Sequence, residues 1–260
     1  MNTFSVLLQA YVKLPHLALG ERIAGLLSVH LQDATVRLRH QQGIIWENLP
    51  FDKANALASF LIEKGYPSGL VPQNELVQPG NMMLSRKAEI MDSVFVFVDI
   101  NDNRLSLSDG NVALAQVGWI LEEVEVGSAC RDKPVATSTL RLKGEGKYRY
   151  YGIDRHAPET EPFGWVLNMF SKGSHPDCVR IQGRSFNYSY QGLHEGGWKD
   201  RFGRLLSDLS NILSPGKMDE GFILAMATPL KPAQLAEYET PKAMIERARW
   251  SLTLKLVGAE

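Results

Sequence analysis

The sequence predicts an α+β fold in which a small α/β sandwich precedes a larger, strand-rich unit. Helical patterns dominate the first quarter of the 260 residues, whereas runs of β-branched and aromatic residues dominate from about residue 91 onward. A chain of this length also suits two domains. We therefore expect a domain over 1–75, a linker over 76–90, and an α+β domain over 91–260 with an amphipathic helix near 197–213.

The composition is that of a cytoplasmic globular protein. Lys and Arg number 28 against 29 Asp and Glu, so the net charge of −1 gives no general attraction to nucleic acid or anionic lipid. The N-terminus lacks a basic region, and its apolar run is broken by Gln9 and Lys13, which argues against a signal peptide. No apolar run approaches the ~20 residues of a membrane-spanning helix. We expect Cys130 and Cys178 to be reduced thiols.

The first quarter of the chain predicts six elements in the order strand, helix, short helix, strand, helix, strand. Asp52 is the expected N-cap of the last helix, and Gly65 is its expected stop because glycine tolerates a left-handed conformation. In chain order we expect a strand over 4–14, helices over 19–31 and 32–40, a strand over 43–49, a helix over 52–64 and a strand at 70–71.

Residues 4–72 resemble the C-terminal domain of the bacterial ribosomal stalk protein. The matching features are F-x-V-x-L from Phe4, a short apolar segment that ends in Glu47, D-K-A-x-A-L from Asp52 and L-x-E-x-G from Leu61. The resemblance implies a compact sandwich of β-α-α-β-α-β order and a docking role. That family recruits translation GTPases through a helical face rich in lysine and glycine. The corresponding stretch here, 17–38, has no lysine and only two glycines, so the ribosomal task itself is not implied. Any other small open-faced α/β sandwich would fit the same pattern.

The remainder of the chain predicts several hairpins, as one domain or two fused β-units. Its strand-rich pattern with an amphipathic helix resembles pleckstrin-homology-like folds in architecture alone, which carries no function. The stretch RSFNYSYQG resembles uncharacterised bacterial proteins, from which no activity follows. The expected strands lie at 94–98, 104–107, 111–127, 140–151, 162–171, 178–190, 222–227 and 250–257, and a further helix runs from Thr240-Pro241 to Arg249.

The stretch DINDNRLSLSDG has part of the pattern of a calcium-binding loop. Asp99, Asn101 and Asn103 occupy the first, third and fifth positions of such a loop. The sixth position, which requires glycine, is Arg104, and the twelfth, which requires a bidentate glutamate, is Gly110. We therefore predict a hairpin turn.

One loop gathers side chains that bind metals or act as nucleophiles. His175, Asp177 and Cys178 lie within four residues, and His156 lies in an earlier loop. Zinc needs four ligands, usually from two paired clusters, and only one cluster is present. We expect neither metal nor cofactor, and we expect Cys178 to be a buried structural cysteine. The alternative is an unrecognised enzyme or metal-binding protein that uses His156, His175 and Cys178.

The stretch 141–155 interleaves basic and aromatic residues in the manner of single-strand nucleic-acid binders. The neutral overall charge argues against this function, and a half-buried hairpin explains the pattern as well. The candidate residues for this alternative are Lys143, Lys147, Arg149, Tyr151 and Arg155.

Polar side chains in this sequence are assigned to turns, caps and solvated faces, with none gathered for chemistry. Common nucleophile, zinc-protease, P-loop and dinucleotide motifs do not occur in the sequence. We therefore predict a non-enzymatic cytoplasmic protein that acts as an interaction or scaffold protein. Its partner is another protein or a second copy of itself.

Overall fold

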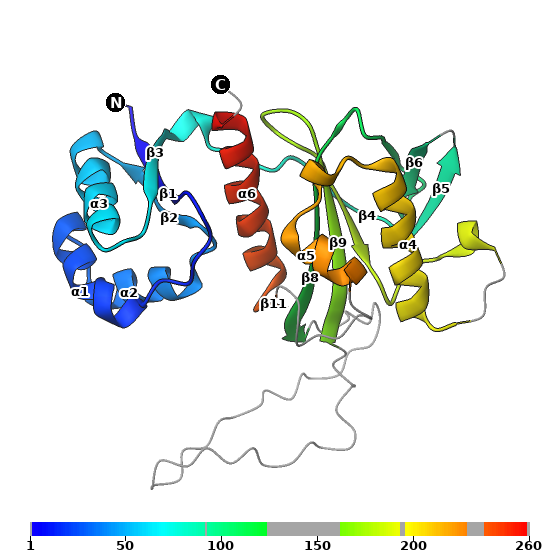
Figure 1. The fold of residues 1–260 in the computed structure, drawn as a ribbon, viewed down its shortest axis with the longest axis horizontal. Coiled ribbons are helices and arrows are strands. Elements are labelled where there is room, and N and C mark those ends of the chain that lie inside the picture. Colours follow the sequence, from blue (N-terminus) through cyan, green and yellow to red (C-terminus); the bar gives the residue numbers. More distant parts are fainter. Residues whose placement is uncertain (1, 92, 124–161, 193–195, 228–236, 259–260) are drawn as a thin grey trace, which may run out of the picture.

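The computed structural model shows an α+β fold in which one helix lies between two β-sheets. That helix, α6 (Pro241–Val257), stands between the N-terminal elements and the strands of the larger unit (Figure 1). None of the described helices combines the length and the apolarity needed to cross a bilayer. The structure describes residues 2–91, 93–123, 162–192, 196–227 and 237–258.

The N-terminal module, residues 2–72, confirms the predicted order of elements. Its strands form an antiparallel sheet in the order β2-β1-β3. Because side chains alternate between the faces of a strand, Val6 and Leu8 pack against the helices, whereas Leu7 points to the opposite face. The elements are β1 (Phe4–Leu8), α1 (His16–Leu27), α2 (Leu31–His40), β2 (Ile44–Leu49), α3 (Phe51–Glu63) and β3 (Ser68–Pro72).

Of the two predicted boundaries of α3, the C-terminal one is confirmed and the N-terminal one is wrong. Gly65 has a φ of +83° and confirms the predicted stop. Asp52 is not the N-cap, because the helix begins at Phe51 and Pro50 holds the cap position without a side-chain hydrogen bond. Asp52 instead lies in the first turn, where a carboxylate still interacts favourably with the positive end of the helix dipole.

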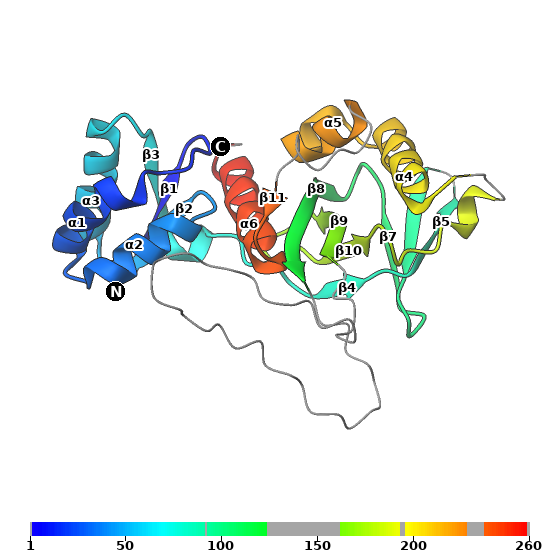
Figure 2. The same ribbon diagram turned by 90° about the horizontal axis from the view of Figure 1, so that it is seen from below.

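The larger unit contains a five-stranded sheet and a three-stranded sheet. The five strands follow the order β11-β8-β9-β10-β4 and the three follow β5-β6-β7. Figure 2 shows α4 and α5 side by side along the strands. The elements are β4 (Met82–Leu84), β5 (Lys87–Met91), β6 (Val94–Val98), β7 (Arg104–Leu107), β8 (Val112–Glu123), β9 (Pro162–Ser171), β10 (Cys178–Gln182), α4 (Trp198–Ile212), α5 (Glu220–Ala227) and β11 (Glu237–Tyr238).

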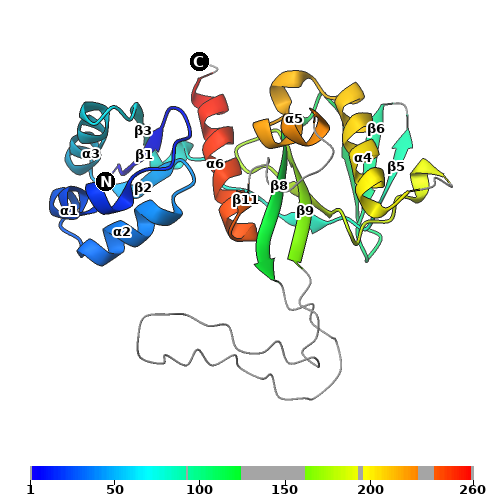
Figure 3. The ribbon, with the colours of Figure 1, turned by 60° about the horizontal axis from the view of Figure 1, so that its bottom comes forward.

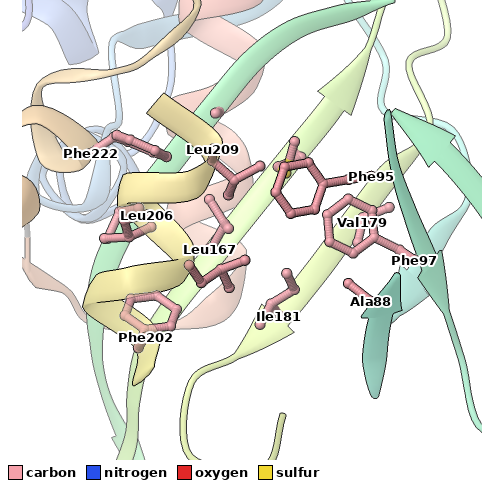
Figure 4. Packing of buried hydrophobic residues seen from close by; sticks show 14 of the residues in the cluster. Ala88, Phe95, Phe97, Leu167, Val179, Ile181, Phe202, Leu206, Leu209 and Phe222 are labelled. Atoms are coloured by element: carbon pink, nitrogen blue, oxygen red, sulfur yellow. The ribbon is translucent and has the colours of Figure 1, made fainter. Parts of the chain in front are cut away.

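One hydrophobic core joins both sheets of the larger unit to α4 and α5. Side chains of α4 and α5 meet the inward residues of β9 and β10, and two phenylalanines of β6 close the other side (Figure 4). The two sheets therefore belong to one packed unit. The residues seen in Figure 4 include Leu167, Val179, Ile181, Phe202, Leu206, Leu209, Phe222, Phe95 and Phe97.

The other face of the five-stranded sheet is covered by α6. Ala248 and Leu252 pack on Leu114, Phe170 and Cys178 of this sheet. One helix turn is 3.6 residues, so side chains four apart lie on the same side of a helix. This side of α6 therefore belongs to the core of the larger unit.

The opposite side of α6 covers the free face of the N-terminal sheet. Trp250 packs with Leu7, Ile44 and Val71, and Leu254 lies one turn further along. The indole Nε1 of Trp250 also donates a hydrogen bond of 2.7 Å to the carbonyl of Leu8. Both faces of the N-terminal sheet are therefore covered, one by α1–α3 and the other by α6.

The predicted final strand over 250–257 is wrong, because these residues belong to α6. Apolar residues at alternate positions, Trp250, Leu252 and Leu254, imitate the period of a strand. In the structure, Leu252 faces one sheet, whereas Trp250 and Leu254 face the other. A helix buried on two sides lacks the single apolar stripe by which a surface helix is recognised. The predicted start of this helix is confirmed, since Thr240 Oγ1 accepts a hydrogen bond from Ala243 N (3.1 Å).

Two further strand predictions are wrong for local reasons. Residues 222–227 form most of α5, a helix of 8 residues, and a short apolar run does not distinguish a helix from a strand. Residues 183–190 leave the sheet after β10 and end in a short 3-10 helix, Ser189–Gln191. Their aromatic residues Phe186 and Tyr188 are core residues.

The predicted linker over 76–90 contains parts of both sheets of the larger unit. β4 pairs in parallel with β10, and β5 is an edge strand of the three-stranded sheet. Leu76 and Val77 are buried next to α6. Runs of three and five residues, as in β4 and β5, are too short to show a clear period. The hairpin of β6 and β7 and the strands β9 and β10 are confirmed. The likeness to pleckstrin-homology folds stays a prediction, and the hairpin over 140–151 lies outside the described residues.

The close contact between Gly43 and Trp250 predicts a specific sensitivity to substitution. Gly43 has a φ of +101°, and a Cβ there would overlap the Trp250 ring. We expect Gly43→Ala to lower the free energy of unfolding by ~2–4 kcal/mol, through left-handed strain and overpacking together. Urea unfolding monitored by circular dichroism measures this loss.

Gly65→Ala is the matched control for Gly43→Ala. Gly65 has a similar φ of +83°, but no atom lies within 4 Å of the added Cβ. We expect a loss of about 1 kcal/mol from backbone strain alone. If both variants lowered the free energy of unfolding by the same amount, the Trp250 ring of α6 would not be in close contact with Gly43.

Candidate functional site

The predicted hairpin turn at Asp99 is confirmed. Its Oδ1 accepts hydrogen bonds from the backbone N–H groups of Asn101 (2.7 Å) and Asn103 (2.9 Å). Its Oδ2 accepts a third from the side chain of Asn103 (2.7 Å). The hydrogen bond from the Asn103 side chain contributes most to lowering the pKa of Asp99. The carboxylate therefore serves the turn between β6 and β7.

The cluster around Cys178 does not form a site. Cys178 is fully buried under α6, and burial raises the pKa of its thiol to about 12. His175 is exposed, and Asp177 Oδ1 accepts a hydrogen bond from Asn81 N (3.1 Å). Among the described residues, no three His, Cys, Asp or Glu side chains are placed to hold a metal ion. His156 lies outside the described residues.

The nucleic-acid candidates Lys143, Lys147, Arg149, Tyr151 and Arg155 also lie outside the described residues. Cys130 does as well. The prediction that rests on 141–155 therefore stays a prediction.

A ladder of buried polar side chains crosses the five-stranded sheet beneath α6. Arg180 Nε donates to Asn168 Oδ1 (2.9 Å), and Asn168 Nδ2 donates to Gln116 Oε1 (3.4 Å). Gln116 Nε2 then donates to the hydroxyl of Tyr238 (3.2 Å). Asn168 stands in register with both Arg180 and Gln116. In the sequence, the signal for this ladder is a single polar residue in the middle of each apolar strand. Which of these residues lie next to one another follows only from the register of the strands.

A cleft lies between the N-terminal module and the start of α6. It has a volume of about 570 Å³ and is lined by α2, β2, β11 and the first turns of α6. Figure 3 shows α2 and β2 on one side, with α6 and β11 on the other. Ligand sites occur preferentially at such junctions between structural units. The cleft is therefore the first candidate for a ligand site.

The walls of this cleft carry opposite charges. The side formed by the N-terminal module presents Lys13, Arg37, Arg39 and His40, with Glu47 near α6. The side formed by β11 and α6 presents mainly carboxylates and one amine. These residues are Glu237, Glu239, Glu246 and Lys242.

Two contacts position the basic wall. Nδ1 of His40 lies within hydrogen-bond distance of Oε2 of Glu239 (2.8 Å), so this contact joins the two walls. Arg37 donates through Nε to the carbonyl of Ile45 (3.1 Å), and its guanidinium lies 4.8 Å from the ring centre of Trp46. The neighbouring Arg39 is exposed and makes no ion pair with a described residue.

A buried ion triad fixes α6 to β2 beside the cleft. Arg249 donates to Glu47 Oε2 (3.0 Å), to Glu246 Oε2 (2.7 Å) and to the carbonyl of Val77 (3.2 Å). Burial by itself lowers the pKa of Arg249, but the hydrogen bond to Glu47 and the charge of Glu246 outweigh it and raise the pKa. Glu47 and Arg249 are 202 positions apart, so sequence patterns gave no signal for the pair.

The cleft gathers charged groups suited to binding. Among its described lining residues, Thr240 is the only Ser, Thr or Cys, and its hydroxyl caps α6. We expected polar side chains not to be gathered in one place. This expectation is wrong, because acidic and basic side chains and the imidazole of His40, from distant segments, line the same cleft.

The outer side of α1 and α2 forms a second candidate surface. Leu17 is 79% exposed and Leu31 is 52% exposed. Leu17 belongs to α1, and Leu31 is the first residue of α2. The two helices are in close contact at the buried Gly20, where a Cβ would stand 2.7 Å from Thr35 Oγ1 and 3.5 Å from Leu31 Cδ1. We call the exposed surface of Leu17 and Leu31 the leucine face.

Asp219 joins α5 to the edge of β8. Its Oδ1 accepts hydrogen bonds from Phe222 N (2.7 Å) and Val117 N (3.2 Å). Burial raises the pKa of this carboxyl group to about 7, although both hydrogen bonds lower it. Arg247 and Lys255 of α6 also lower it through their charge.

No protein-family model matches the chain, and the searches of curated proteins and solved structures found no match either.

The ion triad predicts energetic coupling between Glu47 and Arg249. In a double-mutant cycle with Glu47→Gln and Arg249→Met, we expect a coupling free energy of about 1–3 kcal/mol, because Arg249 is desolvated and each single change leaves a buried polar partner. Urea unfolding of the four proteins measures it. The exposed pair Glu89 and Arg104, 3.4 Å apart, is the control. We expect its coupling to stay below about 1 kcal/mol. Additive losses at Glu47 and Arg249 would contradict the prediction.

The raised pKa of Asp219 predicts that this residue destabilises the fold as pH rises. The folded state keeps a proton that the unfolded state releases from its ordinary pKa of 3.8 upward, so the free energy of unfolding falls between pH ~4 and ~7. Asp219→Asn keeps the accepting oxygen and removes the charge. We expect the variant to gain on the order of 2 kcal/mol over the natural chain at pH ~8 relative to pH ~4. Urea unfolding at several pH values checks this, and a difference that does not vary with pH would refute it.

Proposed function

We propose that this chain is a non-enzymatic interaction protein whose N-terminal module binds a protein partner through the leucine face. The observation that carries the proposal is that both faces of the module's sheet are already covered. Its sheet is covered by α6 on one side and by its own helices on the other, so the outer side of those helices is the surface that remains. That surface presents Leu17 and Leu31 to solvent.

The leucine face has the features of a small docking surface. Burying a leucine side chain contributes ~1.5–3 kcal/mol, so two such anchors supply a useful part of the free energy of binding. Gly20 lets α2 approach α1 closely, since Thr35 Oγ1 would stand 2.7 Å from a Cβ at Gly20. The two exposed leucines therefore belong to one closely packed pair of helices.

The resemblance to the ribosomal stalk domain favours the same part of the module. In that family, a helical face does the docking. The stretch 17–38 has no lysine, so the exposed leucines would carry the docking in place of a lysine-rich face. We infer a cytoplasmic role, which agrees with the free, buried thiol of Cys178.

Charge insertion on the leucine face tests the proposal. We expect Leu17→Glu with Leu31→Glu to reduce capture of the partner at least tenfold, because two carboxylates would be buried without partners in the complex. The measurement is affinity capture from a lysate of the source cells, quantified by mass spectrometry. Size-exclusion chromatography with light scattering tests a second copy of the chain as the partner.

Ile223→Glu is the matched control. Ile223 is 51% exposed on α5, in the larger unit, so its replacement leaves the leucine face intact. The control should capture the partner as the natural chain does, and both variants should unfold within about 0.5 kcal/mol of it. The proposal fails if the natural chain recovers no stoichiometric partner, itself included, or if the double variant recovers the same one.

A further inference from the structure

We propose that the cleft between the N-terminal module and α6 binds a small zwitterion, a free amino acid or a short peptide. Its carboxylate would lie against Lys13 and Arg39, and its ammonium group against Glu237 on the opposite wall. This inference goes beyond the leucine face, because it concerns a different surface of the module.

The first step is the balance of charge in the cleft. Its lining carries four carboxylates (Glu47, Glu237, Glu239 and Glu246) and four permanent cations (Lys13, Arg37, Arg39 and Lys242). A polyanion such as a nucleotide would meet the carboxylates, and a polyamine would meet the cations. A ligand with one charge of each sign meets a favourable partner at both ends.

Some of the charged groups in the cleft are already paired with a neighbouring residue, whereas others remain available to a ligand. Glu246 and Glu47 are engaged by Arg249, and Glu239 by His40. Lys13 and Arg39 on one wall, and Glu237 and Lys242 on the other, make no ion pair with a described residue. The available charges are therefore positive on the side of the module and of both signs on the side of β11 and α6, where Glu237 is the available carboxylate.

The third step is size and rigidity. A volume of about 570 Å³ falls within the ~300–1,000 Å³ of small-molecule sites. The triad of Arg249 and the hydrogen bond from Trp250 to Leu8 hold the two walls in place without a ligand. A preformed site loses less free energy to ordering when the ligand binds.

The fourth step is the apolar surface between the walls. Tyr11 is 38% exposed and Val36 is 50% exposed, and both line the cleft. The guanidinium of Arg247 lies over the Tyr11 ring, and this ring lies edge-on to Trp250 (6.2 Å between centroids). The apolar side chain of the ligand would contact this surface. The geometry therefore favours an amino acid with an aliphatic or aromatic side chain.

A series of leucine derivatives tests the requirement for both charges. L-Leucine carries both, N-acetyl-leucine keeps the carboxylate only, and leucinamide keeps the ammonium group only. Leucyl-leucine tests whether the site takes a peptide. We expect leucine or leucyl-leucine to bind in isothermal titration calorimetry at neutral pH and low salt, and each blocked analogue to bind at least tenfold more weakly.

Charge reversal on each wall locates the site. We expect Arg39→Glu and Glu237→Lys each to weaken binding of the zwitterion at least tenfold. Lys172→Glu, an exposed change in the larger unit, should leave it unchanged. Leu17→Glu with Leu31→Glu should bind the probe like the natural chain, which separates this test from that of the docking role.

Three results would overturn the inference. The first is the absence of heat from any probe at millimolar concentrations. The second is equal affinity for leucine and its blocked analogues. The third is binding that survives both wall variants while circular dichroism shows them folded. In each case the opposite charges of the cleft would act only to hold the N-terminal module against α6, without binding a ligand.

Discussion

The burial of α6 between two sheets is the interaction on which the rest of the structure depends. Each sheet has one face covered by helices of its own unit and another covered by α6. Without this helix, both sheets would expose apolar faces, including Leu7 and Val71 on one and Leu114 and Phe170 on the other. Helix α6 thus completes both cores and joins the two units.

The polar contacts of α6 explain how such a helix keeps one position. Apolar surfaces on both sides do not by themselves prevent sliding along the helix axis. A shift of one turn, about 5.4 Å, would separate Arg249 from Glu47 and Trp250 from the carbonyl of Leu8. It would also break the hydrogen bond from Val77 N to Thr253 Oγ1 (3.1 Å). Since a buried unpaired guanidinium is costly, these contacts specify the register of the helix.

The sequence predicted those parts of the fold that depend on local patterns. The N-terminal module was found element by element, since its helices have one buried face and its strands are bounded by turns. The hairpin at Asp99 and the cap at Thr240 follow from side chains that bond within a few residues. The end of α6 and the short strand β4 were missed because burial on two sides, or a span of three residues, removes the period on which prediction relies.

The candidate cleft could not be predicted for a related reason. Its charges come from α2, β2, β11 and α6, and the contacts that order them join residues about 200 positions apart. In the sequence, Arg39 and Glu237 look like ordinary solvated charges. Only the position of α6 turns them into facing walls, because the triad at Glu47 brings its first turns beside α2. The helix that completes both cores therefore also creates the charged cleft at the junction of the two units, and any ligand there would bind to both units at once.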